Sequence, residues 1–490
     1  MSLSTITSNA QIAFEQYISF SHQQRAAFLE SIATNIESLG DELIETASQE
    51  TNLPAARLQG ERGRTCYQLR MYAAMLLKGD YVDATIETAV PTKTPPKPDI
   101  RSMFQPMGPV VVFGASNFPF AYSTAGGDTA SALAVGCSVI VKAHPAHIKT
   151  SSLVATAIQK AIVDCAMPTH VFQHVSAAEL LMNEIDLGKA LVQDEAITAV
   201  GFTGSRVGGR ALLDYATARK NPIPVFAEMG SVNPVILLED IIATQAEAIA
   251  TQYAGSITLG VGQFCTNPGI LIGVQSKALN DFAQHLAKAM KAYTPATMLH
   301  SGIQAAYLKN STAAMEQKGV CVYTDQNPDA ENAYPVLATV DANTFLANPI
   351  LSEEVFGPYS ILVQCKDMNE LKAVWTSLHG QITTTIMGTD KDLHDNKSLL
   401  DNAFLHAGRV VINGVPTGVE VCDSMVHGGP YPASTDSRFT AVGVKAVKRW
   451  LRPVSYQNWP DQLLPEALQN ANPLNIWRSI DGQLTKDALK

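Results

Sequence analysis

Short apolar segments alternate with helical segments between residues 109 and 202, and this alternation restricts the possible folds more than any other feature. Four segments have the length of strands and are rich in Val, Ile and Phe: 109–114, 138–142, 171–175 and 197–202. Helical patterns separate them, among them 120–135 and 150–166. Apolar strands of this kind are typical of sheets covered on both faces, and strand–helix alternation predicts a parallel α/β sheet with right-handed connections. Such sheets bind ligands at the carboxyl ends of their strands.

The chain has 490 residues, which is too long for one hydrophobic core and predicts two or three domains. The N-terminal part has the pattern of helices, with a capping box at 21–24 and a third helix from Pro54. The tail predicts a strand near 450–456 and a helix near 460–470. The expected parts are N-terminal helices (1–88), an extended crossing and oligomerisation segment (89–108), a first α/β domain (109–233), a second α/β domain (234–440) and a C-terminal oligomerisation arm (441–490).

The composition argues against several classes of partner. A net charge of −10, a pI near 5.6 and the lack of a basic run with interleaved aromatic residues argue against nucleic acid. The first residues show no secretory signal, and no segment has the length of a membrane span. The seven cysteines are scattered and form no CxxC pair. This spacing predicts reduced thiols in a cytoplasmic protein, with neither a disulfide framework nor a metal site.

Two loops at predicted strand ends have the chemistry of a nucleotide site. Gly201–Ser205 places glycines and a hydroxyl where a helix begins, which suits a phosphate, although the pattern alone more often marks a plain helix cap. Lys142–Lys149 contains lysine and histidine. A dinucleotide fold that uses NAD usually has an acid here for the ribose 2′-hydroxyl, and this loop has none. A nucleotide bound at this loop could therefore carry a 2′-phosphate.

Two single residues stand out by their surroundings. Cys265 follows two glycines and precedes the turn 266–269, so its thiol is reachable and nearby backbone N–H groups could bind an oxyanion. The alternative is a small buried side chain, which is what most free cysteines are. Glu228 lies inside the apolar stretch Val225–Gly230. A carboxylate there is catalytic, protonated or paired with a cation.

Five motifs, in their order along the chain, resemble the aldehyde dehydrogenase superfamily. They are Phe113–Phe120, Gly201–Ser205, Phe226–Gly230, Gly262–Cys265 and Glu353–Pro358. The resemblance implies a Rossmann-type parallel-sheet cofactor domain, followed by an α/β catalytic domain and an oligomerisation arm. It also implies oxidation of an aldehyde to a carboxylate with NAD(P), in a homodimer or homotetramer.

The same resemblance implies a role for each site residue. Cys265 is the expected nucleophile, Glu228 the general base, and Asn117 forms the oxyanion hole with the Cys265 backbone N–H. Phe118 is expected beside the substrate, and no metal is implied. Pro145 stands where NAD-preferring members have a glutamate, so NADP is expected over NAD, with NAD still usable. The expected cofactor contacts are Lys142 at the ribose, Ser205 at the pyrophosphate, Glu354 and Phe356 at the nicotinamide ribose and ring, and Ser116, Gly204 and Met229 around them.

Within the superfamily, three stretches resemble the branch that oxidises α-ketoglutaric semialdehyde (2,5-dioxopentanoate) to 2-oxoglutarate. They are 61–65, 263–269 and 414–419 with 427–430. Such a substrate carries a carboxylate, which an arginine would bind through a bidentate, charge-assisted contact. Arg62, Arg64 and Arg438 are the candidates. Arg62 and Arg64 lie two positions apart on a helix, so at most one of them can face the substrate.

Two other functions are compatible with the sequence. A fatty or medium-chain aldehyde dehydrogenase that uses NADP would need a tunnel with apolar walls. A catalytically silent dinucleotide-binding protein would be expected to lack Cys265 or Glu228, and both are present.

Overall fold

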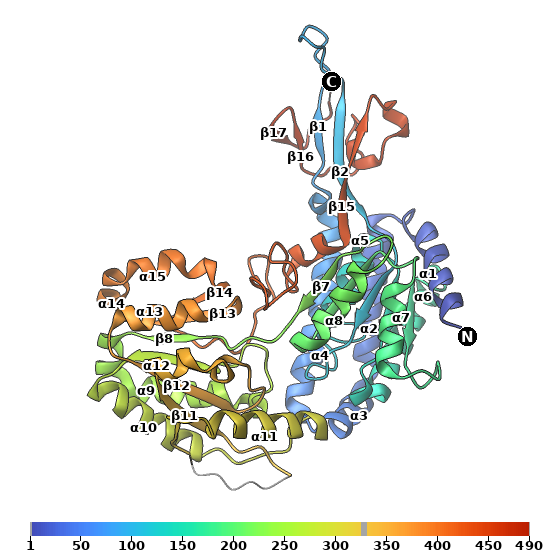
Figure 1. Ribbon diagram of the computed structural model, residues 1–490. Coiled ribbons are helices and arrows are strands. Elements are labelled where there is room, and N and C mark those ends of the chain that lie inside the picture. The colour runs from blue at the N-terminus through green and yellow to red at the C-terminus, as the bar shows by residue number, and fades with distance from the viewer. Residues whose placement is uncertain (1, 325–330, 490) are drawn as a thin grey trace.

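The computed structural model describes residues 2–324 and 331–489, and its strands form three sheets (Figure 1). The first is a five-stranded parallel sheet with the order β5-β4-β3-β6-β7. This arrangement confirms the parallel α/β sheet predicted from the alternation. Its strands are β3 (Val110–Phe113), β4 (Val139–Lys142), β5 (Phe172–Val175), β6 (Ala199–Thr203) and β7 (Val225–Glu228).

Helices cover both faces of this sheet because successive strand residues point in opposite directions. Val110 and Val112 pack into the core on one face, whereas Val111 and Phe113 pack into the core on the other. The first core contains α2 (His22–Ser38), α3 (Gly40–Thr51), α4 (Ala55–Lys78), α5 (Gly127–Val135) and α6 (Ile148–Asp164). The second contains α1 (Leu3–Tyr17), α7 (Glu184–Gln193) and α8 (Arg206–Thr217).

The second sheet has seven strands in the order β10-β11-β12-β9-β8-β13-β14, and all neighbours are parallel except β10 and β11. The strands are β8 (Val235–Leu237), β9 (Ile270–Val274), β10 (Cys321–Val322), β11 (Val336–Asp341), β12 (Tyr359–Cys365), β13 (Gln381–Met387) and β14 (Ala407–Ile412). One core holds α9 (Glu239–Thr258) and α10 (Lys277–Lys291). The other holds residues of α11 (Ser301–Met315), α12 (Ala342–Ala347), α13 (Met368–Ser377) and α15 (Lys397–Asn402), with α14 (Asp390–Asp395) next to α15.

The third sheet forms an arm that stands away from the two α/β parts, at the top of Figure 1. Its order is β15-β2-β1-β16-β17, so segments far apart in the sequence pair with one another. The strands are β1 (Thr85–Glu87), β2 (Ile100–Pro106), β15 (Leu451–Gln457), β16 (Arg478–Ile480) and β17 (Gln483–Thr485). Short 3₁₀ helices connect the elements of the molecule: η1 (Asp80–Val82), η2 (Pro145–His147), η3 (Leu259–Gly262), η4 (Pro349–Ser352), η5 (Ala403–Leu405), η6 (Val444–Trp450), η7 (Asp461–Leu463) and η8 (Glu466–Leu468).

Two predicted helices differ in the structure. The helix expected over 120–135 begins only at Gly127. Residues 119–126 form turns instead, and there the backbone N–H groups of Phe120 and Ala121 donate to the buried Glu61 carboxylate. The helix expected near 460–470 is two separate 3₁₀ turns, each preceded by a proline, Pro460 or Pro465. The capping box at 21–24 is present as predicted. None of the described helices is long and apolar enough to cross a membrane. The expected domain boundaries remain predictions.

Candidate active site

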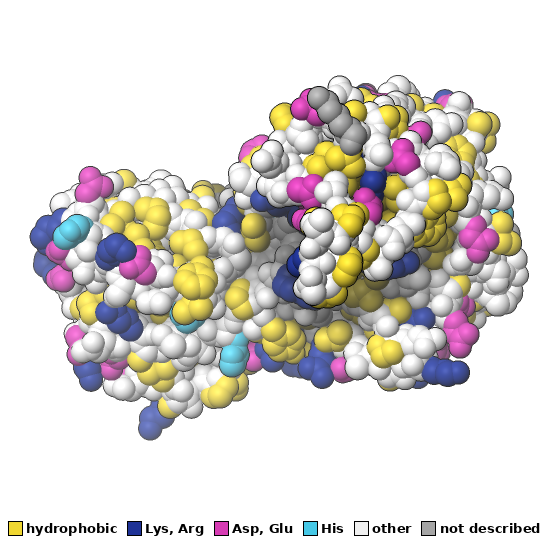
Figure 2. Space-filling view, turned by 90° about the horizontal axis from the view of Figure 1, so that it is seen from above, with side chains coloured by type: hydrophobic (Ala, Val, Ile, Leu, Met, Phe, Trp, Pro, Cys, Tyr) yellow, Lys and Arg dark blue, Asp and Glu magenta, His cyan; other side chains and the backbone are white. Residues whose placement is uncertain are grey.

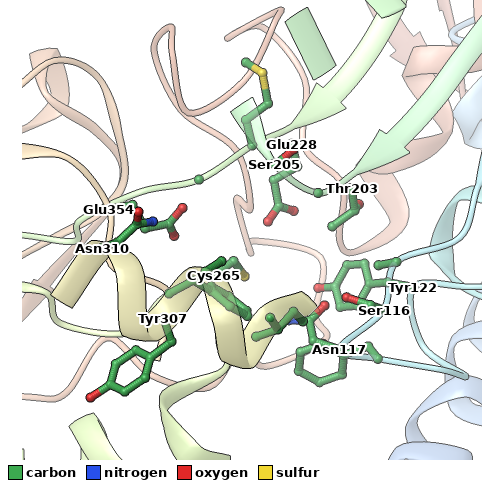
Figure 3. A pocket seen from close by; sticks show the side chains of 18 residues that line it. Ser116, Asn117, Tyr122, Thr203, Ser205, Glu228, Cys265, Tyr307, Asn310 and Glu354 are labelled. Carbon is green, nitrogen blue, oxygen red and sulfur yellow. The ribbon is translucent and has the colours of Figure 1, made fainter. Parts of the chain in front are cut away.

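A cavity of about 320 Å³ contains most of the residues that the sequence predicted for the site (Figure 3). They come from the ends of β3, β6 and β7, from the loop before β9, and from the loop before β12. Carboxyl ends of neighbouring parallel strands share one edge of a sheet, which explains why the ends of β3, β6 and β7 meet. The loops before β9 and β12 belong to the seven-stranded sheet and join them at the cavity. The predicted residues that line the cavity are Ser116, Asn117, Phe118, Gly204, Ser205, Glu228, Met229, Cys265, Glu354 and Phe356.

Cys265, Glu228 and His427 form a close group at the side of this cavity. The Cys265 Sγ atom lies 3.5 Å from His427 Nε2, and the same nitrogen lies 3.0 Å from Glu228 Oε2. Glu228 ends β7 and is 4% exposed, while His427 is 1% exposed. Burial raises the pKa of the Cys265 thiol well above its usual value, and the nearby Glu228 carboxylate raises this pKa further. The thiol is therefore the resting form, and it needs a base to become a nucleophile.

The side-chain amide of Asn117 is held beside the cysteine loop. Its Nδ2 atom donates to the Gln263 carbonyl oxygen at 3.1 Å, two residues before Cys265. Arg57 fixes the same segment from α4 by donating from Nη2 to the Asn117 carbonyl oxygen at 2.7 Å. Figure 3 shows Asn117 and Cys265 as neighbours in the lower half of the cavity. An amide donor in this position can bind an oxygen that develops negative charge.

The other half of the cavity has the features of a dinucleotide site. Ser205 caps α8 by accepting from the Gly208 N–H at 3.1 Å, so the first turn of this helix opens toward the cavity and suits a phosphate. Glu354 accepts a hydrogen bond from the Ser231 N–H at 3.3 Å. A side chain at Gly230 would displace the Glu354 carboxylate from its present position. Burial raises the pKa of Glu354 to about 7.

Lys142 does not line the cavity, although it ends β4 at the same edge of the sheet. Its buried ammonium group forms an ion pair with Glu184, the first residue of α7. The sequence indicated a loop without an acid after β4. The fold supplies an acid to that position from α7, which follows the neighbouring strand β5.

The three arginines proposed for a substrate carboxylate lie in different surroundings. Arg62 donates from Nη1 to the Gly40 carbonyl oxygen at 2.7 Å, and Arg438 donates to Asp436 at 2.8 Å; neither lines the cavity. Arg64 donates to the hydroxyl of Tyr122 at 3.2 Å, and Tyr122 does line the cavity. The Nε atom of Arg64 is buried and has no hydrogen-bond partner among the described residues. Of the three, only Arg64 contacts a residue of the site.

The sequence reasoning missed several lining residues. One face of α11 contributes four of them, at a helical spacing that could have been recognised: Ile303, Ala306, Tyr307 and Asn310. Tyr122 follows the Phe113–Phe120 motif directly, and His427 begins a motif that was noted for its resemblance alone. Nothing in the local sequence connects His427 to Glu228, 199 positions earlier. Their contact depends on the tertiary fold.

The arrangement supports nucleophilic chemistry on a substrate that also contacts a dinucleotide. A thiol, a carboxylate and an amide donor converge on one side of the cavity, and a helix N-terminus with a buried carboxyl lies on the other. The residues present therefore fit a nicotinamide dinucleotide, with the phosphates at α8 and a ribose near Glu354.

Comparison with known proteins supports the same conclusion. Residues 2–445 match the model of the aldehyde dehydrogenase family. The chain is 48% identical to alpha-ketoglutaric semialdehyde dehydrogenase 2 of Azospirillum brasilense, over 97% of this chain and 90% of that protein. It is 45% identical to alpha-ketoglutaric semialdehyde dehydrogenase of Acinetobacter baylyi, over 99% and 92%. Glyceraldehyde-3-phosphate dehydrogenase of Methanocaldococcus jannaschii, solved with NADP, has the same fold, with a TM-score of 0.77 at 19% identity over 93% of each chain. The chain belongs to the aldehyde dehydrogenase family and is an NAD(P)-dependent oxidoreductase that acts on aldehydes.

Proposed function

We propose that the protein oxidises 2,5-dioxopentanoate to 2-oxoglutarate by covalent catalysis at Cys265, with NADP preferred and NAD usable. The observation that carries the chemistry is the convergence of Cys265, Glu228 and Asn117 on one cavity. The names of the two relatives with 48% and 45% identity over nearly the whole chain support the substrate.

The first step is attack of Cys265 on the aldehyde carbon. The thiol proton passes to a neighbouring base, and the two candidates within reach are Glu228 and His427, whose Nε2 lies 3.5 Å from Sγ. A carbon–sulfur bond forms, and the carbonyl oxygen becomes an alkoxide. The Asn117 amide and the Cys265 backbone N–H hold this oxygen, and each such donor contributes about 3–4 kcal/mol in comparable sites.

The second half of the reaction releases the product. The chemistry that NAD(P) supplies when bound is acceptance of the hydride from the substrate carbon, which leaves a thioester on Cys265. Glu228 takes a proton from a water molecule as that water attacks the thioester. The carbon–sulfur bond then breaks, the thiolate leaves, and the acid is released. General-base assistance of this kind contributes roughly 10²–10⁴-fold in rate.

Two substitutions separate these steps. Cys265→Ala is expected to abolish oxidation while cofactor binding is retained, because the nucleophile alone is removed. Glu228→Gln is expected to allow one rapid turnover of reduced cofactor and then slow steady-state release, because acylation can proceed while deacylation loses its base. Stopped-flow absorbance of NADPH measures both. Residual steady-state activity of Cys265→Ala within about tenfold of the wild type would contradict covalent catalysis at this residue.

The substrate carboxylate is proposed to bind near Arg64. Its guanidinium group lies 5.6 Å from the Tyr122 ring centre, and Tyr122 faces the same cavity as Cys265. Arg57 adds a second positive charge, 5.0 Å from the ring centres of both Phe118 and Phe264. These rings form an apolar wall that would also suit a fatty aldehyde. The arginines packed on them favour a substrate with a negatively charged end.

Replacing Arg64 by Met tests this assignment. A charge-assisted contact contributes roughly 1.5–3 kcal/mol, so KM for 2,5-dioxopentanoate should rise about 10- to 150-fold. KM for propanal, which has no carboxylate, should change little. Arg438→Met is the matched control, because Arg438 is exposed and paired with Asp436. Equal losses on both aldehydes in Arg64→Met would contradict a carboxylate-binding role and would favour the medium-chain aldehyde.

The preference for NADP depends on the loop after β4. Pro145 stands in this loop, and the loop itself contributes no acid that would repel a 2′-phosphate. Glu184 opposes this preference. Its ion pair with Lys142 places a carboxylate at the same edge of the sheet, and this carboxylate would repel a 2′-phosphate. We therefore propose a moderate preference, measured as the ratio of kcat/KM for NADP to that for NAD. We also propose that the enzyme is a cytoplasmic homodimer or homotetramer assembled through the arm.

A further inference from the structure

Cys265, His427 and Glu228 present three different metal-binding atoms to one point. The sulfur, the imidazole Nε2 and a carboxylate oxygen all lie within 4.8 Å of one another. Two of the three separations are 3.5 Å, from Sγ to Nε2, and 3.0 Å, from Nε2 to Glu228 Oε2. Within residues 2–324 and 331–489, no other group of three or more Cys, His, Asp or Glu side chains lies close enough together to hold a metal ion.

The separations agree with those between the ligands of a tetrahedral zinc ion. Zinc–sulfur bonds of about 2.3 Å and zinc–nitrogen bonds of about 2.0–2.1 Å place the two ligand atoms roughly 3.6 Å apart. The corresponding nitrogen–oxygen separation is roughly 3.4 Å. The Cys265–His427 pair already has the required distance, and the Glu228–His427 pair needs to open by a few tenths of an ångström. The sulfur and the Glu228 carboxylate oxygen lie within 4.8 Å of one another.

The electrostatic surroundings also favour a cation. Glu228 is 4% exposed, and neither of its carboxylate oxygens accepts a hydrogen bond from the described residues, although His427 Nε2 is 3.0 Å away. An ionised carboxylate in this state is unfavourable unless a cation is near. Arg64 and Arg409 are cations near the Cys265 thiol. Arg64 donates to Tyr122 and the Val419 carbonyl oxygen, and Arg409 donates to the carbonyl oxygens of Pro416 and Gly418.

We propose that Zn²⁺ binds to Cys265 Sγ, His427 Nε2 and Glu228 and inhibits the enzyme reversibly. On binding, the thiol loses its proton to solvent and the sulfur forms a bond to the metal, so one proton is released per ion. The fourth position of the tetrahedron faces the cavity and holds water. Inhibition is complete, since the metal occupies the nucleophile and the base together; this step rests on the roles proposed above for Cys265 and Glu228.

Inhibition and direct binding test the site separately. Aldehyde oxidation is assayed at buffered free Zn²⁺ concentrations, and activity is restored with EDTA. Co²⁺ serves as the spectroscopic probe on the enzyme without substrate, because a thiolate bound to cobalt gives a charge-transfer absorption that requires no turnover. The variants are Cys265→Ser, Glu228→Gln and His427→Asn, each checked for its Tm. Cys321→Ser is the matched control, since Cys321 is an exposed thiol on β10, far from the cavity lining.

The expected results are specific to the three ligands. The wild type and Cys321→Ser are inhibited alike and show the cobalt absorption. Cys265→Ser loses the absorption, and His427→Asn and Glu228→Gln, which each remove a ligand, bind Zn²⁺ at least about 10-fold more weakly by titration against a chromophoric chelator, since even the loss of an outer-shell partner weakens binding about 10- to 100-fold. Zinc affinity of the wild type rises with pH while the thiol is protonated. Equal zinc affinity in the wild type, His427→Asn and Glu228→Gln would overturn the proposal. Failure of metal-free wild-type enzyme to oxidise aldehydes would instead contradict the proposed function.

Discussion

Titratable side chains in the cavity have pKa values that differ from those of the same side chains at the surface, because they lie beside one another away from water. The thiol of Cys265 is the clearest case, since its pKa is raised first by burial and then by the carboxylate of Glu228. Both effects favour the neutral thiol when substrate is absent. The same carboxylate that suppresses the thiolate is also one of the two bases proposed above to take its proton.

Glu184 is expected to restrain the use of NADP. Its carboxylate is bound to Lys142 at the carboxyl end of β4, where a dinucleotide fold commonly has an acid for the ribose 2′-hydroxyl. A 2′-phosphate at the same place would meet a like charge, which weakens binding. Glu184→Gln should therefore raise the NADP-to-NAD ratio of kcat/KM by about 10- to 100-fold.

The control for this change is Asp186→Asn. Asp186 lies in the same first turn of α7 and is exposed, and its carboxylate contacts Asn183 rather than Lys142. Its substitution should leave the cofactor ratio unchanged. If the two variants shift the ratio equally, the effect comes from the net charge of the helix end and Glu184 has no specific role.

Glu354 is expected to make cofactor binding dependent on pH near neutrality. Its pKa is raised to about 7 by burial, so the free enzyme holds a neutral carboxyl below that pH and a carboxylate above it. The carboxylate offers two negatively charged acceptor oxygens to the ribose hydroxyls, whereas the neutral carboxyl is a weaker acceptor and carries a proton on one oxygen. The Kd for NAD should thus fall by roughly tenfold between pH 6 and pH 8, as the ionised fraction rises.

Fluorescence titration with NAD measures this dependence, and NAD is preferred to NADP because a 2′-phosphate itself titrates near pH 6, by analogy with phosphorylated side chains. Glu354→Gln is the matched variant, since its amide cannot ionise. Its Kd should be flat over the same range. An unchanged slope in Glu354→Gln would assign the dependence to another group.

At the level of elements, the cysteine loop is positioned by a backbone that only glycine tolerates. Gly262 ends η3 with φ of 65°, and a Cβ there would overlap the backbone of Gly357 and Pro358. This close approach joins the loop before β9 to the loop before β12, which carries Glu354. Gly262→Ala should lower the free energy of unfolding by roughly 2–4 kcal/mol and reduce kcat, because Cys265 is three residues away.

Gly63→Ala provides the comparison for Gly262→Ala. Gly63 lies within α4, and nothing approaches within 4 Å of a Cβ built there. Alanine has the higher helix propensity, so this change should stabilise the protein by up to about 1 kcal/mol. Urea unfolding of both variants gives the two values. A loss of stability in Gly63→Ala as large as that in Gly262→Ala would contradict the steric explanation.

The elements that the sequence predicted well are those whose pattern is local. The four strands of 109–202 were found because apolar runs separated by helical patterns depend only on neighbouring residues. The helix start at Gly127 was missed because residues 119–126 form turns that contact Glu61 on a distant helix, which the local pattern does not reveal. The ion pair of Lys142 with Glu184 was missed for the same reason. The sequence motifs identified the cavity residues at the strand ends. His427 could be assigned to the site only from its contacts in the folded structure.

At the scale of the whole molecule, the arm stands away from the two α/β parts that form the cavity. Two buried arginines stabilise its irregular end: Arg101 donates to the Leu468 carbonyl oxygen at 2.6 Å, and Arg478 donates to that of Asn470 at 3.1 Å. The family match ends at residue 445, so β15, β16 and β17 lie beyond it. β15 forms one edge of the arm sheet and β17 the other. An edge strand presents backbone groups that a second chain can pair with.

The arm also exposes large apolar side chains, and Figure 2 shows hydrophobic side chains spread over its upper face. Trp459 and Trp477 are each 49% exposed, Leu463 is 63% exposed and Leu484 is 71% exposed. Apolar groups gathered on a projecting sheet mark a surface that binds another protein. The arm is therefore expected to bury these groups against a second copy of the chain.

Substituting Trp459 and Leu463 together by Asp should break the assembly, because two charges would have to be buried in an apolar interface. Light scattering after gel filtration is expected to show a homodimer or homotetramer for the wild type and a smaller species for the double variant. The sheets and the cavity lie within single chains, so the isolated subunit should keep its far-UV circular dichroism and bind NAD. Phe404→Asp is the control, since Phe404 is 67% exposed on η5 of the second α/β part. A wild-type mass retained by the Trp459 and Leu463 double variant would place the subunit interface elsewhere on the molecule.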